Sequence, residues 1–206
     1  MAFFGFGKKK QSLPNDTAAG KFAKHLDEIF QQEPMLFLEK STIEGVPGVT
    51  AFVYKDIPEK GYVTGITYGL SLVEHPDWKY GRPELCITVK SDRIEWARVA
   101  AFIANQLRGD CPFSYAQSIN FGQKVSNDSD MNAFIIFAPA ILDREEFLNI
   151  DIGAPYKISV AGLYPVYSEE LEAYAEMGLE AFWHHPNFDM YNLQREKITQ
   201  SPPANS

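Results

Sequence analysis

The sequence predicts an α+β fold in which helices pack on a mainly antiparallel or mixed β-sheet. Its pattern is one helix, several strands, a helix, further strands and a final helix, without the strand–helix alternation of a doubly wound fold. At 206 residues the chain suits one domain, and such a domain buries about 70% of the surface of its unfolded form. We expect residues 16–186 to form this domain, between a mobile N-terminus (residues 1–15) and a polar, frayed C-terminal tail (residues 187–206).

The first half of the chain is predicted to contain one helix and four strands. Thr17 is a suitable N-cap for the helix, whose apolar residues recur at spacings of three and four. Gly- and Pro-containing turns separate the segments that follow, which are rich in β-branched and aromatic residues or alternate apolar with polar side chains. Strands are predicted at residues 35–38, 49–54, 62–70 and 84–90.

The second half is predicted to add two helices and two strands. One helix opens at Asp92, where Glu95 would complete a capping box, and ends at Gly109, while Ser168 opens the last helix. The helix that opens at Asp92 has a broad apolar face, which requires it to pack against a sheet. Strands are predicted at residues 131–138 and 157–163, and Pro139 and Pro165 follow them as terminating residues.

Composition excludes several classes of function. Lys and Arg total 19 against 27 Asp and Glu, so the formal net charge of −8 disfavours nucleic acid and anionic membranes and favours a basic partner. Cys86 and Cys111 show no disulfide framework, and the N-terminus lacks the apolar stretch of a secretory signal. No apolar run approaches the length of a membrane span. We expect a cytoplasmic protein with no cofactor.

The segment around Asp128 and Asp130 resembles the first half of a calcium loop, because Asn132 continues the alternate oxygen-bearing side chains. Ala133 stands where that loop needs glycine, and Pro139 stands where it needs a bidentate glutamate. The sequence therefore favours a polar turn ahead of a buried strand.

Two catalytic alternatives depend on other residues. Ser71 lies in a partial nucleophile elbow, but Val73 replaces the second glycine that such a sharp turn requires. His184 and His185 could contribute to a metal site only if further ligands converged on them, and their position after a helix explains them more simply. A hydrolase using Ser71 or a metal enzyme using the two histidines remains an alternative.

Candidate partner-binding residues lie in a loop and on acidic segments. The loop between two predicted strands carries large aromatic residues and an arginine, which are typical of interface anchors, although Trp78 could instead cover a sheet edge. Glu169, Glu170, Glu172, Glu176 and Glu180 would form an acidic helix face that is solvated or contacts a basic partner. The candidates are Trp78, Tyr80, Arg82, Asp128, Asp130, Glu169, Glu172 and Glu176.

Several of these segments resemble the suppressor-of-fused domain family. The resemblance is carried by residues 67–72 (TYGLSL), residues 83–89 (PELCITV), Trp96, residues 137–143 (FAPAILD) and residues 158–171, which contain GLYP. The similarity spans roughly residues 61–183, and the order and spacing of the segments are more specific than any one of them.

The resemblance implies an α/β sandwich that binds protein partners and is not an enzyme. Animal members resemble this chain only in their N-terminal domain and hold a transcription-factor peptide between it and a second domain, so that peptide site is not carried over. Bacterial single-domain relatives are associated with toxin systems, which implies an immunity protein that neutralises a toxin. A structural or oligomerisation role is the remaining alternative, and the sequence does not determine the oligomeric state.

Overall fold

The computed structural model describes residues 14, 16–79 and 81–199 of the chain. Its helices are α1 (Ala18–Phe30), α2 (Ile94–Leu107), α3 (Arg144–Phe147) and α4 (Glu170–Trp183). Its strands are β1 (Met35–Leu38), β2 (Thr50–Lys55), β3 (Tyr62–Tyr68), β4 (Arg82–Lys90), β5 (Ser118–Asn120), β6 (Ala133–Phe137) and β7 (Ile158–Val166). Of the segment 1–15 that was predicted to be mobile, residue 14 is described, and the other residues lie outside the described part of the chain.

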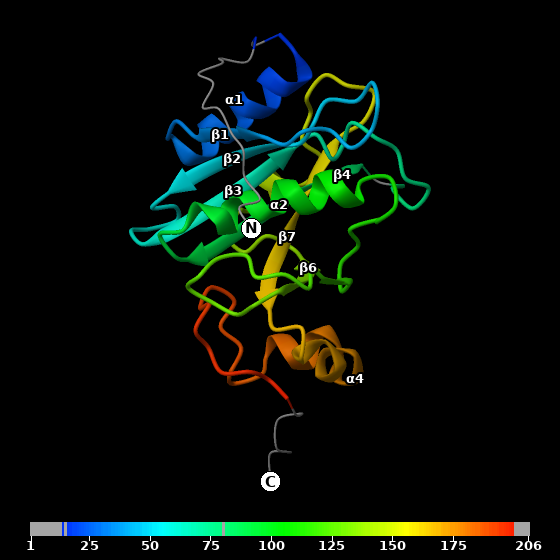
Figure 1. Cartoon of the computed structure of the whole chain (residues 1–206). Coiled ribbons are helices and arrows are strands. Elements are labelled where there is room, and N and C mark those ends of the chain that lie inside the picture. Colours follow the sequence, from blue (N-terminus) through cyan, green and yellow to red (C-terminus); the bar gives the residue numbers. More distant parts are fainter. Residues whose placement is uncertain (1–13, 15, 80, 200–206) are drawn as a thin grey trace.

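The strands form a seven-stranded mixed sheet in the order β1-β2-β3-β4-β7-β6-β5 (Figure 1). Neighbouring strands pair antiparallel except β4 and β7, which run parallel from Arg82↔Ile158 to Ile87↔Leu163. The predicted α+β class with a mixed sheet is therefore confirmed. Among the described helices, none combines the length and apolar character needed to cross a bilayer.

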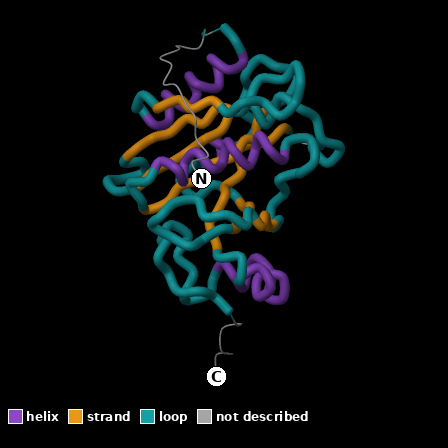
Figure 2. The backbone as a smooth tube through the Cα atoms, viewed as in Figure 1, coloured by secondary structure: helices purple, strands orange, loops and turns teal. Residues whose placement is uncertain are grey.

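Helices cover both faces of the sheet (Figures 1 and 2). On one face α2 buries Trp96 and Ile103 against strand residues such as Leu85. On the other face α1 packs Phe22 against the β2 side of the sheet. On this second face, β6 and β7 also pack against α4, where Phe182 is fully buried. The chain thus surrounds a central sheet with apolar contacts on both sides.

The observed helix caps match the sequence prediction for α1 but not for α2. Thr17 caps α1 by accepting a 3.0 Å hydrogen bond from the Gly20 N–H, as predicted. The capping box predicted at Asp92 does not form, because Ser91 Oγ instead accepts from the Arg93 N–H and α2 begins at Ile94. Serine and aspartate side chains can both accept a hydrogen bond from a nearby backbone N–H group, and before α2 the serine is the acceptor.

Pro165 lies inside β7, not beyond its end as the sequence suggested. The β4 pairing of β7 stops at Leu163, so Pro165 pairs with β6 alone, opposite Phe134. A proline lacks a backbone donor and is tolerated where a strand has a neighbour on one side only.

The chain beyond residue 186 was expected to be frayed. Residues 187–199 instead pack against the sheet and α4, and Leu193 and Ile198 are buried. Polar residues dominate this segment, but its few apolar side chains and Arg195 face the protein. We call residues 187–199 the C-terminal segment.

Candidate functional site

A groove of about 360 Å³ lies between the loop that precedes β6 and the C-terminal segment. Its walls are residues 124 and 127–130 from the loop, residue 167 after β7, and residues 193–194. We call this feature the polar groove, because charged, amide and hydroxyl groups predominate in its walls. It contains two of the acidic residues that the sequence predicted for partner binding, Asp128 and Asp130.

Asp128 holds the groove loop to the body of the protein. Its carboxylate accepts hydrogen bonds from Ser91 Oγ (2.5 Å) and Trp96 Nε1 (2.9 Å). Partial burial raises the pKa of Asp128, but these hydrogen bonds outweigh that effect and leave the pKa below its usual value. Asp128 therefore has a structural task besides any contact with a partner.

Asp130 and Glu169 are exposed carboxylates, each bound to a lysine. Lys124 Nζ donates to Asp130 at 2.8 Å, and Lys197 Nζ donates to Glu169 at 2.6 Å. These hydrogen bonds are the main reason why the pKa values of both carboxyls lie below their usual range. Lys197 Nζ also lies 4.9 Å from the centroid of the Tyr167 ring, on the groove wall.

A buried ion pair fixes the C-terminal segment beside the polar groove. Arg195 donates to both carboxylate oxygens of Glu170, at 2.6 and 2.7 Å, and both side chains are almost fully buried. Glu170 also accepts from the N–H groups of Tyr167 (2.9 Å) and Ile198 (2.7 Å). The expectation that Glu170 belongs to an exposed acidic face is wrong, because an arginine distant in sequence draws it inward.

The remaining glutamates of α4 are exposed, as predicted. Glu172 and Glu176 follow Glu169 at spacings of three and seven, so the three lie on one face of the helix. Among the described residues, Glu172 and Glu176 make no ion pair. We call Glu169, Glu172 and Glu176 the acidic face. Its first member, Glu169, adjoins the polar groove, because Lys197 binds it and also contacts the Tyr167 ring on the groove wall.

The aromatic loop lies at the other end of β4. Trp78 is half-buried against the α2 side of the core, and its Nε1 donates to the Pro112 carbonyl at 2.8 Å. Arg82 begins β4, donates to Glu74 at 2.5 Å and lies 4.0 Å from the Tyr156 ring centroid. Asp128, in contrast, bonds to Ser91 beyond the end of β4.

Nine strand residues span about 30 Å, so the structure does not bring Trp78 and Arg82 to the polar groove. Tyr80 lies outside the described residues. A partner-binding role for these three positions stays a prediction.

Ser71 does not have the surroundings of a nucleophile. It is fully buried, and its Oγ donates to Glu84 at 2.7 Å. Glu84 accepts further bonds from Thr67 Oγ1 at 2.6 Å and from the N–H groups of Gly69, Leu70 and Ser71. Burial raises the pKa of Glu84, although these donors oppose that shift. The group is a buried network that closes the β3–β4 connection.

The histidines likewise fail to assemble a metal site. His184 is exposed, and His185 Nδ1 accepts from the Asn187 N–H at 3.1 Å. Across the part of the chain that the structure describes, no three His, Cys, Asp or Glu side chains gather as metal ligands.

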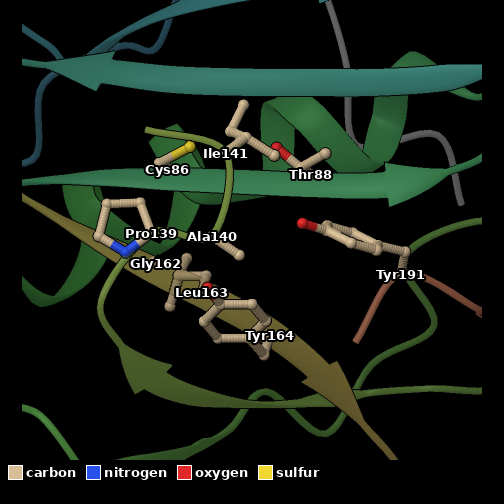
Figure 3. Close-up of a pocket in the computed structure, with 9 residues that line it drawn as sticks. All are labelled: Cys86, Thr88, Pro139, Ala140, Ile141, Gly162, Leu163, Tyr164 and Tyr191. Atoms are coloured by element: carbon tan, nitrogen blue, oxygen red, sulfur yellow. The ribbon is translucent and has the colours of Figure 1, made fainter. Parts of the chain in front are cut away.

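A second cavity is too small for a substrate. It measures about 10 Å³ and lies on the sheet between Cys86, Thr88, Tyr164 and Tyr191 (Figure 3). That volume suits about one water molecule. Burial raises the pKa of the Cys86 thiol to about 12, so it stays protonated and is a poor nucleophile.

Comparison with known proteins relates the chain to one family. The sequence model described as suppressor of fused protein matches residues 45–196. Comparison with curated protein sequences gives no match.

Solved structures share the fold at low sequence identity. A suppressor-of-fused homologue from Neisseria gonorrhoeae superposes with a TM-score of 0.66 at 17% identity, covering 86% of this chain and 94% of the other. A Sufu–Fu complex gives 0.56 at 13% identity, with coverages of 85% and 89%. Drosophila Suppressor of Fused gives 0.59 at 12% identity, and there the match covers 85% of this chain but 50% of the other.

Proposed function

Because the chain belongs to the suppressor of fused family, we propose that it is a non-catalytic module that binds a protein partner through the polar groove and the acidic face. The observation that carries the proposal is the continuity of these two features. The groove offers a concave surface, and Glu172 and Glu176 on the adjoining helix are exposed without an ion-pair partner among the described residues. One structure that shares the fold is a complex of Sufu with Fu.

The charge of the surface supports a basic partner. The formal net charge of −8 would accelerate encounter with a cationic protein at low salt. Large exposed apolar side chains are few, since Leu38 and Tyr115 are the only ones among the described residues. Binding by charge and shape complementarity therefore suits this surface better than binding through a large apolar patch.

A toxin neutralised in the cytoplasm is the partner we propose, and this chain would then act as an immunity protein. The alternatives based on Ser71 and on the two histidines lose support, because Ser71 is inaccessible and the histidines lack convergent ligands in the described structure.

The test begins with affinity capture from the native host, followed by purification of the captured protein and measurement of its dissociation constant. The triple variant Glu169→Gln, Glu172→Gln, Glu176→Gln should weaken binding about tenfold or more at low salt, since several carboxylates act together. Its control is Glu33→Gln, Glu44→Gln, Glu59→Gln, which removes the same charge from exposed positions elsewhere. Equal affinities of the two triple variants would refute the proposed surface.

The immunity role has a separate readout. Co-expression with a toxin encoded beside this chain should restore growth for the wild type and not for the acidic-face variant. Full restoration by that variant would contradict the role of this surface in neutralisation.

A further inference from the structure

Lys197 has the environment that a partner's lysine would seek in the polar groove. Its ammonium group donates to Glu169 at 2.6 Å and lies 4.9 Å from the centroid of the Tyr167 ring. A carboxylate and an aromatic ring face together form a favourable binding site for a cation, and we call this position of Glu169 and Tyr167 the lysine seat. Asp130 adds a second carboxylate, close enough to interact electrostatically with both Lys197 and Glu169.

The Lys197 side chain can leave this seat without disturbing the backbone. Its neighbours in sequence are fixed independently, because Arg195 binds Glu170 and the Ile198 N–H donates to the same carboxylate. The Lys197 and Glu169 side chains are 43% and 58% exposed. Exposed ion pairs of this kind contribute little to stability, so their exchange costs little.

The polar groove has room for an incoming side chain. Its volume of about 360 Å³ is far larger than the space that one water molecule needs. The accessible lining of the groove is mostly polar, and its carboxylates together with the Tyr167 ring suit the ammonium group of an incoming lysine.

We propose that Lys197 is an internal stand-in for a lysine of the partner, which enters the polar groove and displaces Lys197 from Glu169 and Tyr167. This inference rests on the proposed function, because it names the chemistry that the same site recognises. It makes Lys197 an autoinhibitory contact, since the partner must compete with a cation that the chain itself supplies.

The test uses a fluorescent peptide of alternating lysine and glycine, with fluorescence anisotropy at about 50 mM salt, where surface charges are weakly screened. Lys197→Gln should bind this peptide about two- to fivefold more tightly than the wild type, the range expected for removing one exposed competing pair. Lys60→Gln is the matched control, because Lys60 is exposed in a turn and its replacement changes the net charge equally. Equal tightening by Lys60→Gln and Lys197→Gln would overturn the inference, since bulk charge would then explain both.

Two further variants test whether Glu169 and Tyr167 form the site that binds the lysine of the peptide. Glu169→Gln and Tyr167→Leu should each weaken peptide binding about two- to fivefold, whereas Glu180→Gln, on the same helix beyond Gly178, should change it less. An equal loss for Glu180→Gln and Glu169→Gln would contradict a lysine seat at Glu169.

Failure of this inference is distinguishable from failure of the proposed function. If the purified partner loses affinity with the acidic-face variant but is indifferent to Lys197→Gln, the surface stands and the displacement is refuted. If the peptide responds to Lys197→Gln while no partner depends on the acidic face, the seat stands and the proposed function is refuted.

Discussion

Replacing Glu170 by alanine should destabilise the protein strongly, because it leaves Arg195 buried without its counter-ion. The side chains of Arg195 and Glu170 are only 3% and 0% exposed, so little solvent can replace the lost contacts. The change also removes the acceptor of the Tyr167 and Ile198 N–H groups. Breaking a buried pair in this way costs about 3–5 kcal/mol.

The expected result can be measured in two ways. Urea unfolding followed by circular dichroism should give the loss of about 3–5 kcal/mol in the free energy of unfolding. Thermal unfolding should show a decrease in Tm of about 6–20 °C, since each kcal/mol shifts Tm by about 2–4 °C in a domain of this size. Glu172→Ala is the control, because this neighbouring glutamate is exposed and such substitutions stay within about 0.5 kcal/mol.

A double substitution tests the physical reason. Glu170→Leu with Arg195→Met removes both charges, and replacing a buried pair by apolar side chains is often neutral or stabilising. The double variant should therefore be more stable than Glu170→Ala. A loss below about 1 kcal/mol for Glu170→Ala, or strictly additive single and double effects, would refute the view that this pair anchors the C-terminal segment.

Three further outcomes follow from the described contacts. Glu84→Gln should cost about 1–3 kcal/mol in urea unfolding, because its amide would face N–H and O–H donors that now bond to a carboxylate, while Glu59→Gln in an exposed turn should cost almost nothing. Asp128 has a lowered folded-state pKa, so its contribution is fully present above its unfolded value of 3.8 and is lost as pH falls through the folded value. The stability difference between the wild type and Asp128→Asn should accordingly shrink from about pH 6 to about pH 3, and a constant difference would contradict this assignment. Trp78→Ala should lower the free energy of unfolding by about 1–3 kcal/mol, because the half-buried ring covers the core, whereas a loss below about 0.5 kcal/mol would favour its role as an interface anchor.

Local patterns in the sequence predict most of the helices and strands. Thr17 and Gly109 mark helix ends that the structure confirms, since capping depends on neighbouring residues. The parallel pairing of β4 with β7 could not be predicted in this way, because paired residues such as Arg82 and Ile158 are 76 positions apart and their register depends on the whole sheet. The short strand β5 was missed for a related reason, since its pairing with β6 decides its conformation.

The sequence identified several residues of the candidate site but not how those residues are arranged in space. Asp128 and Asp130 were singled out by a partial calcium-loop pattern, and Glu169, Glu172 and Glu176 by a run of acidic residues. The structure places the two aspartates in the walls of the polar groove and the glutamates at the start of α4 and along it. The pairing of Glu170 with Arg195 was not foreseen, because only a tertiary contact distinguishes one glutamate of an acidic run from its neighbours. A signal was available for Glu84, since a carboxylate amid apolar strand residues must find buried donors or be excluded from the core.

The segments that carry the family resemblance serve the scaffold. Thr67 and Ser71 from TYGLSL donate to Glu84 of PELCITV, so two of these segments form one buried network. Trp96 binds Asp128 through its indole N–H. The acidic face and Lys197, in contrast, lie at exposed positions whose replacement leaves that network intact. A fold can therefore be shared while its partner differs, because packing defines the first and exposed charge defines the second. Variants of the acidic face that abolish binding but unfold normally would separate the two contributions in this protein.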